Sequence, residues 1–282
     1  MTILDGKKVS LDIKNSIKEQ VNNIKDIYNK TPGLAIVLVG ENQASKVYVR
    51  NKVKACEYTG IIPTLIKVSE EITEVELLEI VDKLNNDSNI HGIIVQLPLP
   101  KHISEQKVIN AISNEKDVDG FGIENKGKLF TGLDALHSAT PEGIMTLLNA
   151  YNIPIEGKNA VVVGRSNIVG KPIAMLLLSK NATVTIAHSK TKDLASITRG
   201  ADILVVAIGK PKFITSDMVK EGAVVIDVGI NRENGILCGD VDFENVCNKT
   251  SFITPVPGGV GPLTIASLLK NTVLAFENIE KK

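Results

Sequence analysis

The stretch from Ala160 to Pro172 constrains the fold of this chain more than any other part of the sequence. Residues 160–163 form a short apolar run, rich in valine and too short for a helix, that leads into a turn starting at Gly164. A helix-forming stretch then continues through Leu178. A strand, a glycine turn and a helix in this order place backbone N–H groups and a helix N-terminus around a pyrophosphate. The pattern therefore predicts an α/β domain that binds a dinucleotide.

The residues after the next apolar strand, 183–187, indicate which dinucleotide. An NAD site usually has an acidic residue at this point, where it holds the ribose 2′-hydroxyl. Here the chain has Ser189 and Lys190, and Arg165 lies inside the glycine turn. A hydroxyl and two cations suit a 2′-phosphate, so we expect NADP. The Gly-x-Ser-x-x-x-Gly spacing departs from the usual Gly-x-Gly-x-x-Gly, and an ordinary strand–helix turn without a ligand stays open as an alternative.

The same turn resembles a nucleoside triphosphate loop, because it ends on Gly170-Lys171. However, five residues separate Gly164 from Gly170 where that loop has four. Pro172 also stands where a serine or threonine would hold magnesium. We therefore expect no triphosphate site.

Composition limits the partners of the chain. It has 282 residues, 43% of them hydrophobic, and a net charge of zero, which suits roughly two globular domains and gives no support for binding nucleic acid or an anionic membrane. No apolar run approaches the ~20 residues of a membrane span, and the first residues lack a targeting pattern. The three cysteines have no Cys-x-x-Cys spacing, and the four histidines are scattered. These features predict a reducing, cytoplasmic location and no metal site.

Strands and helices are expected to alternate along the chain. The expected strands are 34–39, 62–68, 93–97, 160–163, 183–187, 203–208 and 224–228. The expected helices are 9–28, 45–58, 75–84, a weaker one near 108, one after Thr140 as N-cap, and one from 264 to about 278, with irregular chain over 116–140. This alternation predicts two αβα domains with a cleft between them. We expect the first to cover 1–140, with the last helix, about 264–282, packing back on it, and the second to cover 141–263.

A second group of polar residues gathers in the first half. Ser45, Tyr48 and Lys52 are spaced at i, i+3 and i+7, on one face of a predicted helix. Gln96 ends a buried strand, where its amide needs a partner, and Asp119 lies on the following loop. Ligands of open α/β sheets bind beyond the carboxyl ends of the strands, so these residues predict a site. Taken singly, each has a structural explanation: a packed tyrosine, a solvated lysine, a turn aspartate.

The chain resembles the bifunctional methylenetetrahydrofolate dehydrogenase/methenyltetrahydrofolate cyclohydrolase family, nearly from end to end. The resemblance rests on five segments in the same order: 44–52 (ASKVYVRNK), 95–100 (VQLPLP), 116–120 (KDVDG), 164–172 (GRSNIVGKP) and 254–262 (TPVPGGVGP). One departure is Ala139, which stands where the family usually has cysteine.

The resemblance implies a smaller folate-binding catalytic domain, a Rossmann-type NADP-binding domain and a homodimer. It implies that Lys52 is the central catalytic residue, that Tyr48 packs against the folate ring, that Gln96 orients the lysine and that Asp119 binds the pterin. The other residues it implies are contacts: Ser45, Pro257, Gly258 and Gly261 to the folate, and Gly164, Arg165, Ser166, Ser189 and Ile230 to NADP.

The implied reactions are oxidation of methylenetetrahydrofolate by NADP⁺ and hydrolysis of the methenyl product to formyltetrahydrofolate. Lys52 would transfer protons in the second step, and burial should favour its neutral form. Three other functions stay open from the residues alone: a dehydrogenase without the hydrolytic step, another two-domain NADP enzyme that acts on a small acid or amino acid, and a non-catalytic NADP-binding sensor.

Overall fold

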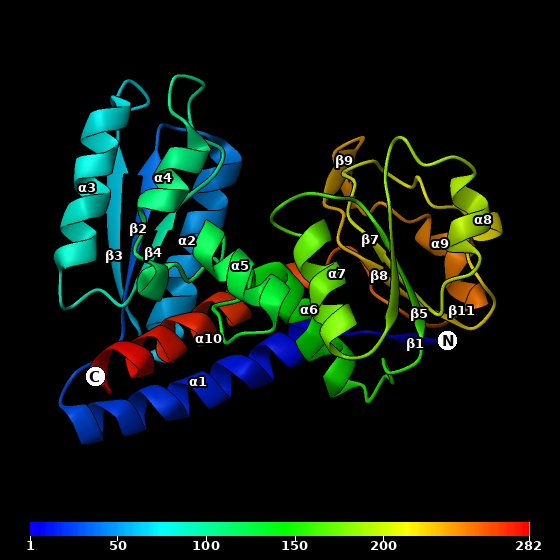
Figure 1. Cartoon of the computed structure of the whole chain (residues 1–282), viewed down its shortest axis with the longest axis horizontal. Coiled ribbons are helices and arrows are strands. Elements are labelled where there is room, and N and C mark those ends of the chain that lie inside the picture. Colours follow the sequence, from blue (N-terminus) through cyan, green and yellow to red (C-terminus); the bar gives the residue numbers. More distant parts are fainter. Residues whose placement is uncertain (282) are drawn as a thin grey trace. The chain divides into compact units, whose positions relative to one another are not determined.

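The computed structural model describes residues 1–281, which divide into two compact units (Figure 1). Unit 1 consists of residues 1–10 and 140–264, and unit 2 consists of residues 11–139 together with residue 265 onward. Each unit has a parallel sheet of its own. The chain therefore passes from one unit to the other three times.

Unit 2 is built on a three-stranded parallel sheet in the order β3-β2-β4. Its strands are β2 (Gly33–Val39), β3 (Ile62–Val68) and β4 (Gly92–Val95). Its helices are α2 (Gln43–Thr59), α3 (Glu74–Asn86), α4 (Glu105–Ala111), the short 3₁₀ turn η1 (Asn114–Lys116) and α5 (Ile123–Thr131). Two further helices, α1 (Gly6–Tyr28) and α10 (Val260–Glu280), begin in unit 1 and continue into unit 2.

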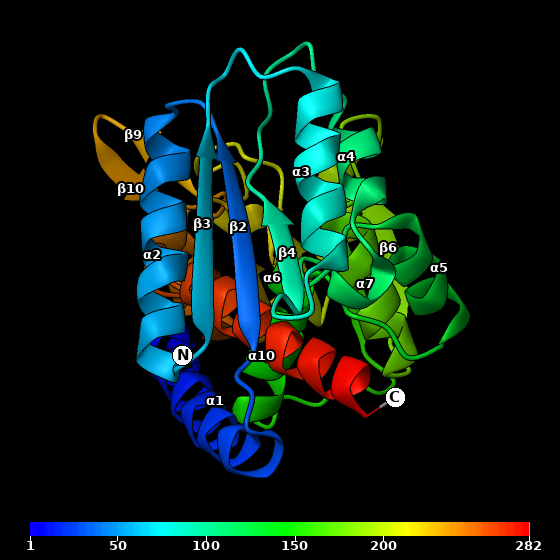
Figure 2. The ribbon, with the colours of Figure 1, turned by 90° about the vertical axis from the view of Figure 1, so that its left-hand side faces the viewer.

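Alternate residues of β2 explain how this sheet is covered. Every residue of β2 is buried, as expected for a central parallel strand with helices on both faces. Leu34, Ile36 and Leu38 pack in a cluster with residues of α1, α2 and α10. Ala35 and Val37 point the other way, into a cluster with residues of α3 and α4. Figure 2 shows α2 and α3 on opposite sides of the three strands.

Unit 1 has a six-stranded parallel sheet in the order β1-β11-β8-β7-β5-β6. Its strands are β1 (Thr2–Ile3), β5 (Asn159–Val163), β6 (Thr183–Ala187), β7 (Ile203–Val206), β8 (Ala223–Asp227) and β11 (Thr250–Ile253). The antiparallel pair β9 (Asn231–Glu233) and β10 (Ile236–Cys238) lies outside this sheet. Its helices are α6 (Ala139–Ala150), α7 (Gly170–Ser179), α8 (Leu194–Thr198) and α9 (Phe243–Val246), with 3₁₀ turns η2 (Ser216–Met218) and η3 (Cys247–Lys249).

The strand order of unit 1 gives the sheet a switch point. β5 comes first among β5, β6, β7, β8 and β11, yet it lies between β6 and β7. The chain therefore builds outward from β5 in both directions, as in a doubly wound fold. Figure 1 shows α6 and α7 on one face of the sheet and α8 and α9 on the other. The predicted two-domain α/β fold with a Rossmann-like sheet is confirmed.

The region 116–140, expected to be irregular, contains the helix α5. Its large side chains Ile123 and Phe130 are 65% and 76% exposed. Because this helix buries no apolar stripe against a core, its sequence lacks the periodic pattern from which a helix is predicted. Thr140, expected as an N-cap, lies inside α6, and its hydroxyl is 2.9 Å from the hydroxyl of Thr264.

The first ten residues belong to unit 1. They do so because β1 pairs with β11, a strand that the sequence did not indicate. Across residues 1–281, none of the helices is long and apolar enough to span a membrane.

Candidate active site

The helix α2 presents the first group of predicted residues. Its N-cap is Asn42, whose side chain accepts a hydrogen bond from the N–H of Ser45 at 3.0 Å and so fixes where the helix begins. Ser45 and Lys52 are buried, whereas Tyr48 is 43% exposed. A packed core tyrosine would be covered, so the exposed ring of Tyr48 is open to a planar ligand.

Lys52 and Gln96 form the central contact. The Nζ of Lys52 donates to Oε1 of Gln96 at 3.1 Å. The Nε2 of Gln96 in turn donates to the carbonyl of Leu97 at 2.8 Å, which fixes which end of the amide faces the lysine. Lys52 is only 7% exposed. The Lys52 nitrogen is therefore held in place by Gln96, the residue that directly follows β4.

Asp119 lies close to the same lysine. Burial raises the pKa of the Asp119 carboxyl above its ordinary value, the positive charge of Lys52 opposes this rise, and the nearby Asp117 adds to it. The structure thus brings Lys52, Gln96 and Asp119 together within unit 2. A half-buried carboxylate beside a buried lysine is an arrangement more typical of a functional site than of a solvated surface.

The loop that carries Asp119 is held by its own neighbours. Asp117 accepts hydrogen bonds from the N–H groups of Phe121 and Gly122, at 3.1 and 2.8 Å, and from the side chain of Asn125 at 3.0 Å. The Nζ of Lys116 donates to the carbonyls at the end of α3: Leu84, Asn85 and Asp87. Lys116 and Asp117 therefore support the loop.

Asn271 of α10 fixes the same loop from another side. Its side-chain amide donates to the carbonyls of Val118 and His137, both at 2.8 Å. Asn271 is 4% exposed, and sequence reasoning did not find it. Its only sequence signal is a polar residue within a largely apolar helix.

In unit 1, the glycine turn after β5 has the form expected from the sequence. Gly164 has φ of 131°, and a Cβ there would lie 2.3 Å from the carbonyl oxygen of Ala207, so only glycine fits. The hydroxyl of Ser166 accepts from the N–H groups of Val169 and Gly170, at 3.1 and 3.2 Å, and so caps the start of α7. Arg165 is exposed beside it.

A pocket of about 290 Å³ opens at the switch point between β5 and β7. Three predicted cofactor residues line it: Gly164, Arg165 and Ser189. The rest of its wall is formed by Val163, His188, Leu194, Ala207, Ile208, Lys210 and Phe213. Ligands of doubly wound sheets bind in this crevice, beyond the carboxyl ends of the strands. Most of the wall residues that the sequence did not predict come soon after the ends of β6 and β7, and this positional rule would have found them: His188, Ala207, Ile208, Lys210 and Phe213.

The predicted residues Ile230, Pro257, Gly258 and Gly261 lie outside that wall but within unit 1. A Cβ on Gly261 would be 3.7 Å from Cδ1 of Ile230, so these two residues are neighbours. The carbonyl of Gly258 accepts from the N–H of Lys7 at 3.1 Å. The loop is therefore fixed by the first turn of α1.

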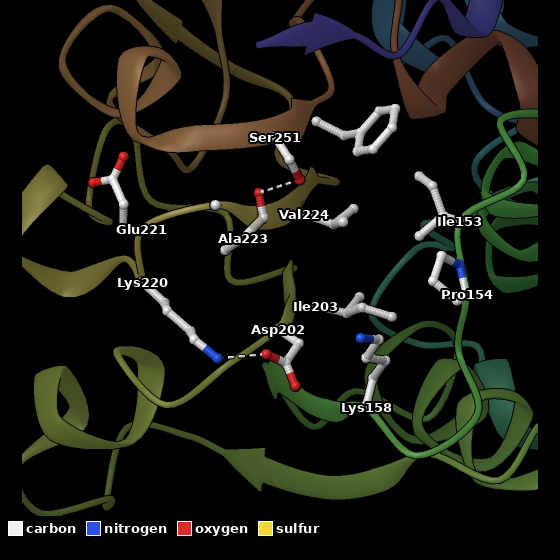
Figure 3. A pocket seen from close by; sticks show the side chains of 12 residues that line it. Ile153, Pro154, Lys158, Asp202, Ile203, Lys220, Glu221, Ala223, Val224 and Ser251 are labelled. Atoms are coloured by element: carbon white, nitrogen blue, oxygen red, sulfur yellow. Dashed lines mark hydrogen bonds and ion pairs between the residues drawn. The ribbon is translucent and has the colours of Figure 1, made fainter.

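Unit 1 has a second hollow of about 330 Å³ at the opposite edge of its sheet (Figure 3). It is formed at the amino ends of β7, β8 and β11, where Asp202 and Lys220 are paired at 2.5 Å. Its floor includes Ile203 and Val224. Although it is slightly larger, it lies at the wrong end of the strands for a ligand of this fold. The pocket at the switch point, in contrast, lies at the end of the strands where ligands of doubly wound sheets bind.

Two family models match successive parts of the sequence. Residues 4–119 match the catalytic domain of tetrahydrofolate dehydrogenase/cyclohydrolase, and residues 138–280 match its NAD(P)-binding domain. The chain belongs to the tetrahydrofolate dehydrogenase/cyclohydrolase family. The family predicted from the five sequence segments is confirmed.

Members of this family resemble the chain over its full length. The bifunctional protein FolD of Listeria innocua is 57% identical, and the match covers 99% of this chain and 98% of that protein. The crystal structure of the bifunctional FolD methylenetetrahydrofolate dehydrogenase/cyclohydrolase of Campylobacter jejuni is 51% identical, with a TM-score of 0.97 over 99% of both chains. A third relative, the Trypanosoma brucei enzyme complexed with NADP and an inhibitor, is 36% identical, with a TM-score of 0.96 over 100% of this chain and 99% of that one.

Proposed function

We propose that this protein is a bifunctional enzyme of one-carbon folate interconversion. It oxidises methylenetetrahydrofolate to methenyltetrahydrofolate with NADP⁺ and then hydrolyses the product to formyltetrahydrofolate. The observation that carries the proposal is the partly buried Lys52–Gln96 hydrogen bond beside a desolvated Asp119, in a chain whose other unit has a pocket at the switch point of its sheet. Membership of the family supports both reactions.

The pocket of unit 1 fits NADP. Gly164 leaves room for a phosphate to approach the backbone, because no side chain projects from it. Arg165 and Ser189 offer a cation and a hydroxyl to the 2′-phosphate. When bound, NADP⁺ supplies the acceptor for a hydride from the one-carbon bridge, and the protein's part in this step is to align the two reactants.

Asp119 recognises the folate. Its carboxylate can accept two parallel N–H bonds from the amino-pyrimidine edge of the pterin, whereas a neutral asparagine offers one acceptor oxygen. Such bonds offset the desolvation that raises its pKa. The exposed ring of Tyr48 then packs against the pterin face.

Lys52 carries the hydrolytic step. Water adds to the methenyl carbon, a C–O bond forms, and the proton that the water loses is transferred through the side chain of Lys52. That proton then goes to the ring nitrogen as the C–N bond breaks. The added hydroxyl loses its remaining proton as the C=O bond forms, and the formyl group stays on the other nitrogen of the product. The hydrogen bond to Gln96 keeps Nζ at a fixed place for both transfers.

We propose that the enzyme is a homodimer and works in the cytoplasm. The three cysteines are free thiols, which fits a reducing compartment. Light scattering on the purified protein tests the first statement, and a monomer mass would refute it.

One progress curve tests the two reactions. Purified protein is mixed with methylenetetrahydrofolate and NADP⁺, and the absorbances of NADPH and of the methenyl product are followed together. We expect NADPH to rise with little methenyl accumulation, compared with the slow uncatalysed ring opening. Equal accumulation of NADPH and the methenyl product would mean that the protein has only the dehydrogenase activity. No reaction would show that methylenetetrahydrofolate is not its substrate.

A further inference from the structure

We infer that Asp240, supported by Asp227, is a positioning residue for the cofactor pocket of unit 1. Neither residue lines the pocket. Both are buried, at 0% and 3% exposure, on the carboxyl side of the sheet. The inference rests on the proposed function only for the identity of the cofactor.

Asp240 fixes the loop that leaves β7. Its Oδ2 accepts from the N–H groups of Ile208 and Gly209, at 2.7 and 3.0 Å, and its Oδ1 accepts from the N–H of Lys210 at 2.8 Å. Oδ1 also accepts from the side chain of Asn231 at 2.8 Å. Ile208 and Lys210 are part of the pocket wall. One carboxylate therefore sets the path of three successive residues, two of which form the wall.

Asp227 holds Asp240 in turn. Its Oδ1 accepts from the N–H groups of Gly229 and Asp240, both at 2.9 Å, and its Oδ2 accepts from the N–H of Val241 at 2.9 Å. The N–H of Asp227 donates to the hydroxyl of Thr254 at 2.7 Å. The two aspartates, through their carboxylates and the N–H of Asp227, thus join the segments that follow β7, β8 and β11, all at the edge of the sheet where the cofactor binds.

Two glycines make room for these carboxylates. A Cβ on Gly229 would lie 2.4 Å from Cγ of Asp240, and a Cβ on Gly239 would lie 1.8 Å from Oδ2 of Asp227. Any other residue at either place would displace a carboxylate. The contacts therefore define a single arrangement of the loops.

The chemistry of the pair explains why it affects binding. A carboxylate accepts hydrogen bonds at both oxygens, whereas an amide would turn an NH₂ group toward a backbone N–H. A loop that is already ordered in the free protein loses little conformational entropy when the ligand binds, so binding is tighter. Loss of the Asp240 carboxylate should therefore weaken cofactor binding, even though the side chain does not touch the cofactor.

The test compares Asp240→Asn with Asp202→Asn in the full-length protein. Asp202 is also a carboxylate of unit 1 that accepts a backbone N–H, from Asn159 at 2.9 Å, but it lies at the opposite edge of the sheet. We expect Asp240→Asn to raise the Kd for NADP⁺ in calorimetry at least tenfold, and to raise the KM for NADP⁺ while kcat at saturating NADP⁺ falls less than threefold. Asp202→Asn should lower the melting temperature and leave the Kd unchanged.

An unchanged Kd in Asp240→Asn, or an equal rise in both variants, would overturn the inference. If Asp240→Asn does not fold, Asn231→Ala decides, because it removes one donor to Asp240 and keeps the carboxylate. A two- to fivefold rise in Kd supports the inference, and no change refutes it. A wild-type protein that binds NADP⁺ without oxidising methylenetetrahydrofolate would refute the proposed function and leave this test intact.

Discussion

The two candidate sites of this protein are built in different ways. In unit 2 the groups that would do chemistry are side chains, namely Lys52, Gln96 and Asp119, carried by a helix, a strand end and a loop. In unit 1 the pocket wall includes a glycine, Gly164, whose conformation excludes a side chain, and a loop that is held by the Asp240 carboxylate outside the wall. The first kind of site depends on which side chains are present. The second depends on where a side chain is absent and on how the loops are fixed.

Replacing Lys52 should produce the largest effect and confine it to one activity. We expect Lys52→Met to lower the hydrolysis rate of methenyltetrahydrofolate by about 10³-fold, within the range lost with a proton-transfer group. The Kd for NADP⁺ should not change, and dehydrogenase activity should stay measurable. Lys54→Met, on an exposed lysine of the same helix, is the control and should behave as wild type. Equal survival of both activities in Lys52→Met would remove Lys52 from the mechanism.

Gly164→Ala tests the backbone character of the other site. The new Cβ would lie 2.3 Å from the carbonyl oxygen of Ala207, at a φ of 131°. We expect a loss of about 3 kcal/mol or more in the free energy of unfolding, together with loss of NADP⁺ binding. Gly157→Ala is the matched control, because its φ is 71° and nothing lies within 4 Å; it should cost about 1 kcal/mol. Equal costs, measured by urea denaturation, would contradict this account.

Asp227 should make the stability of unit 1 depend on pH. Burial raises the pKa of its carboxyl to about 6 in the folded protein, so the folded state binds the proton more tightly than the unfolded state, where the pKa is about 3.9. The stabilisation of the folded state that comes from this raised pKa is therefore fully present below about pH 4 and is lost as the pH rises through 6. We expect the loss to be about 3 kcal/mol relative to Asp227→Asn. Urea denaturation of both proteins between pH 4 and 7.5 measures it, and parallel curves would contradict the prediction.

Arg165 should have the smallest effect, limited to the choice of cofactor. Removing a charge-assisted hydrogen bond to the 2′-phosphate costs about 1.5–3 kcal/mol. We therefore expect Arg165→Ala to reduce the ratio of kcat/KM for NADP⁺ to that for NAD⁺ by about 10- to 100-fold. Lys171→Ala removes a cation from the same segment, one that is hydrogen-bonded to Asn167 at 2.7 Å, and should leave the ratio unchanged. An unchanged ratio in Arg165→Ala would mean that the phosphate is recognised elsewhere.

Sequence reasoning worked best where local pattern and packing agree. The central strand β2 is a continuous apolar run, and the structure ends it at Val39 as expected. The glycine turn was predicted from the apolar run before it and the helix-forming stretch after it, and the structure shows a conformation at Gly164 that excludes other residues. The helix α5 and the pairing of β1 with β11 escaped prediction because α5 exposes its large apolar residues and β1 has only two residues.

The carboxylates of unit 1 were missed for a different reason. The rule that singled out Gln96, a polar residue at the end of a buried apolar strand, applies equally to Asp227 at the end of β8. Asp240 has no such signal, because its partners are backbone N–H groups some 30 residues away in the sequence. Only the folded chain reveals which backbone groups a carboxylate will meet.

The three crossings between the units also determine the order in which the protein can be completed during synthesis. Domains usually fold as they emerge from the ribosome, the N-terminal one first. Here β1 cannot pair until β11, at residues 250–253, has been made, and the core of unit 2 cannot be completed without Leu268, Leu269 and Phe276 of α10. Neither unit can therefore complete its packing before β11 and α10 have been synthesised. A nascent chain stalled halfway would therefore hold two unfinished cores, and neither half would be a stable truncated product.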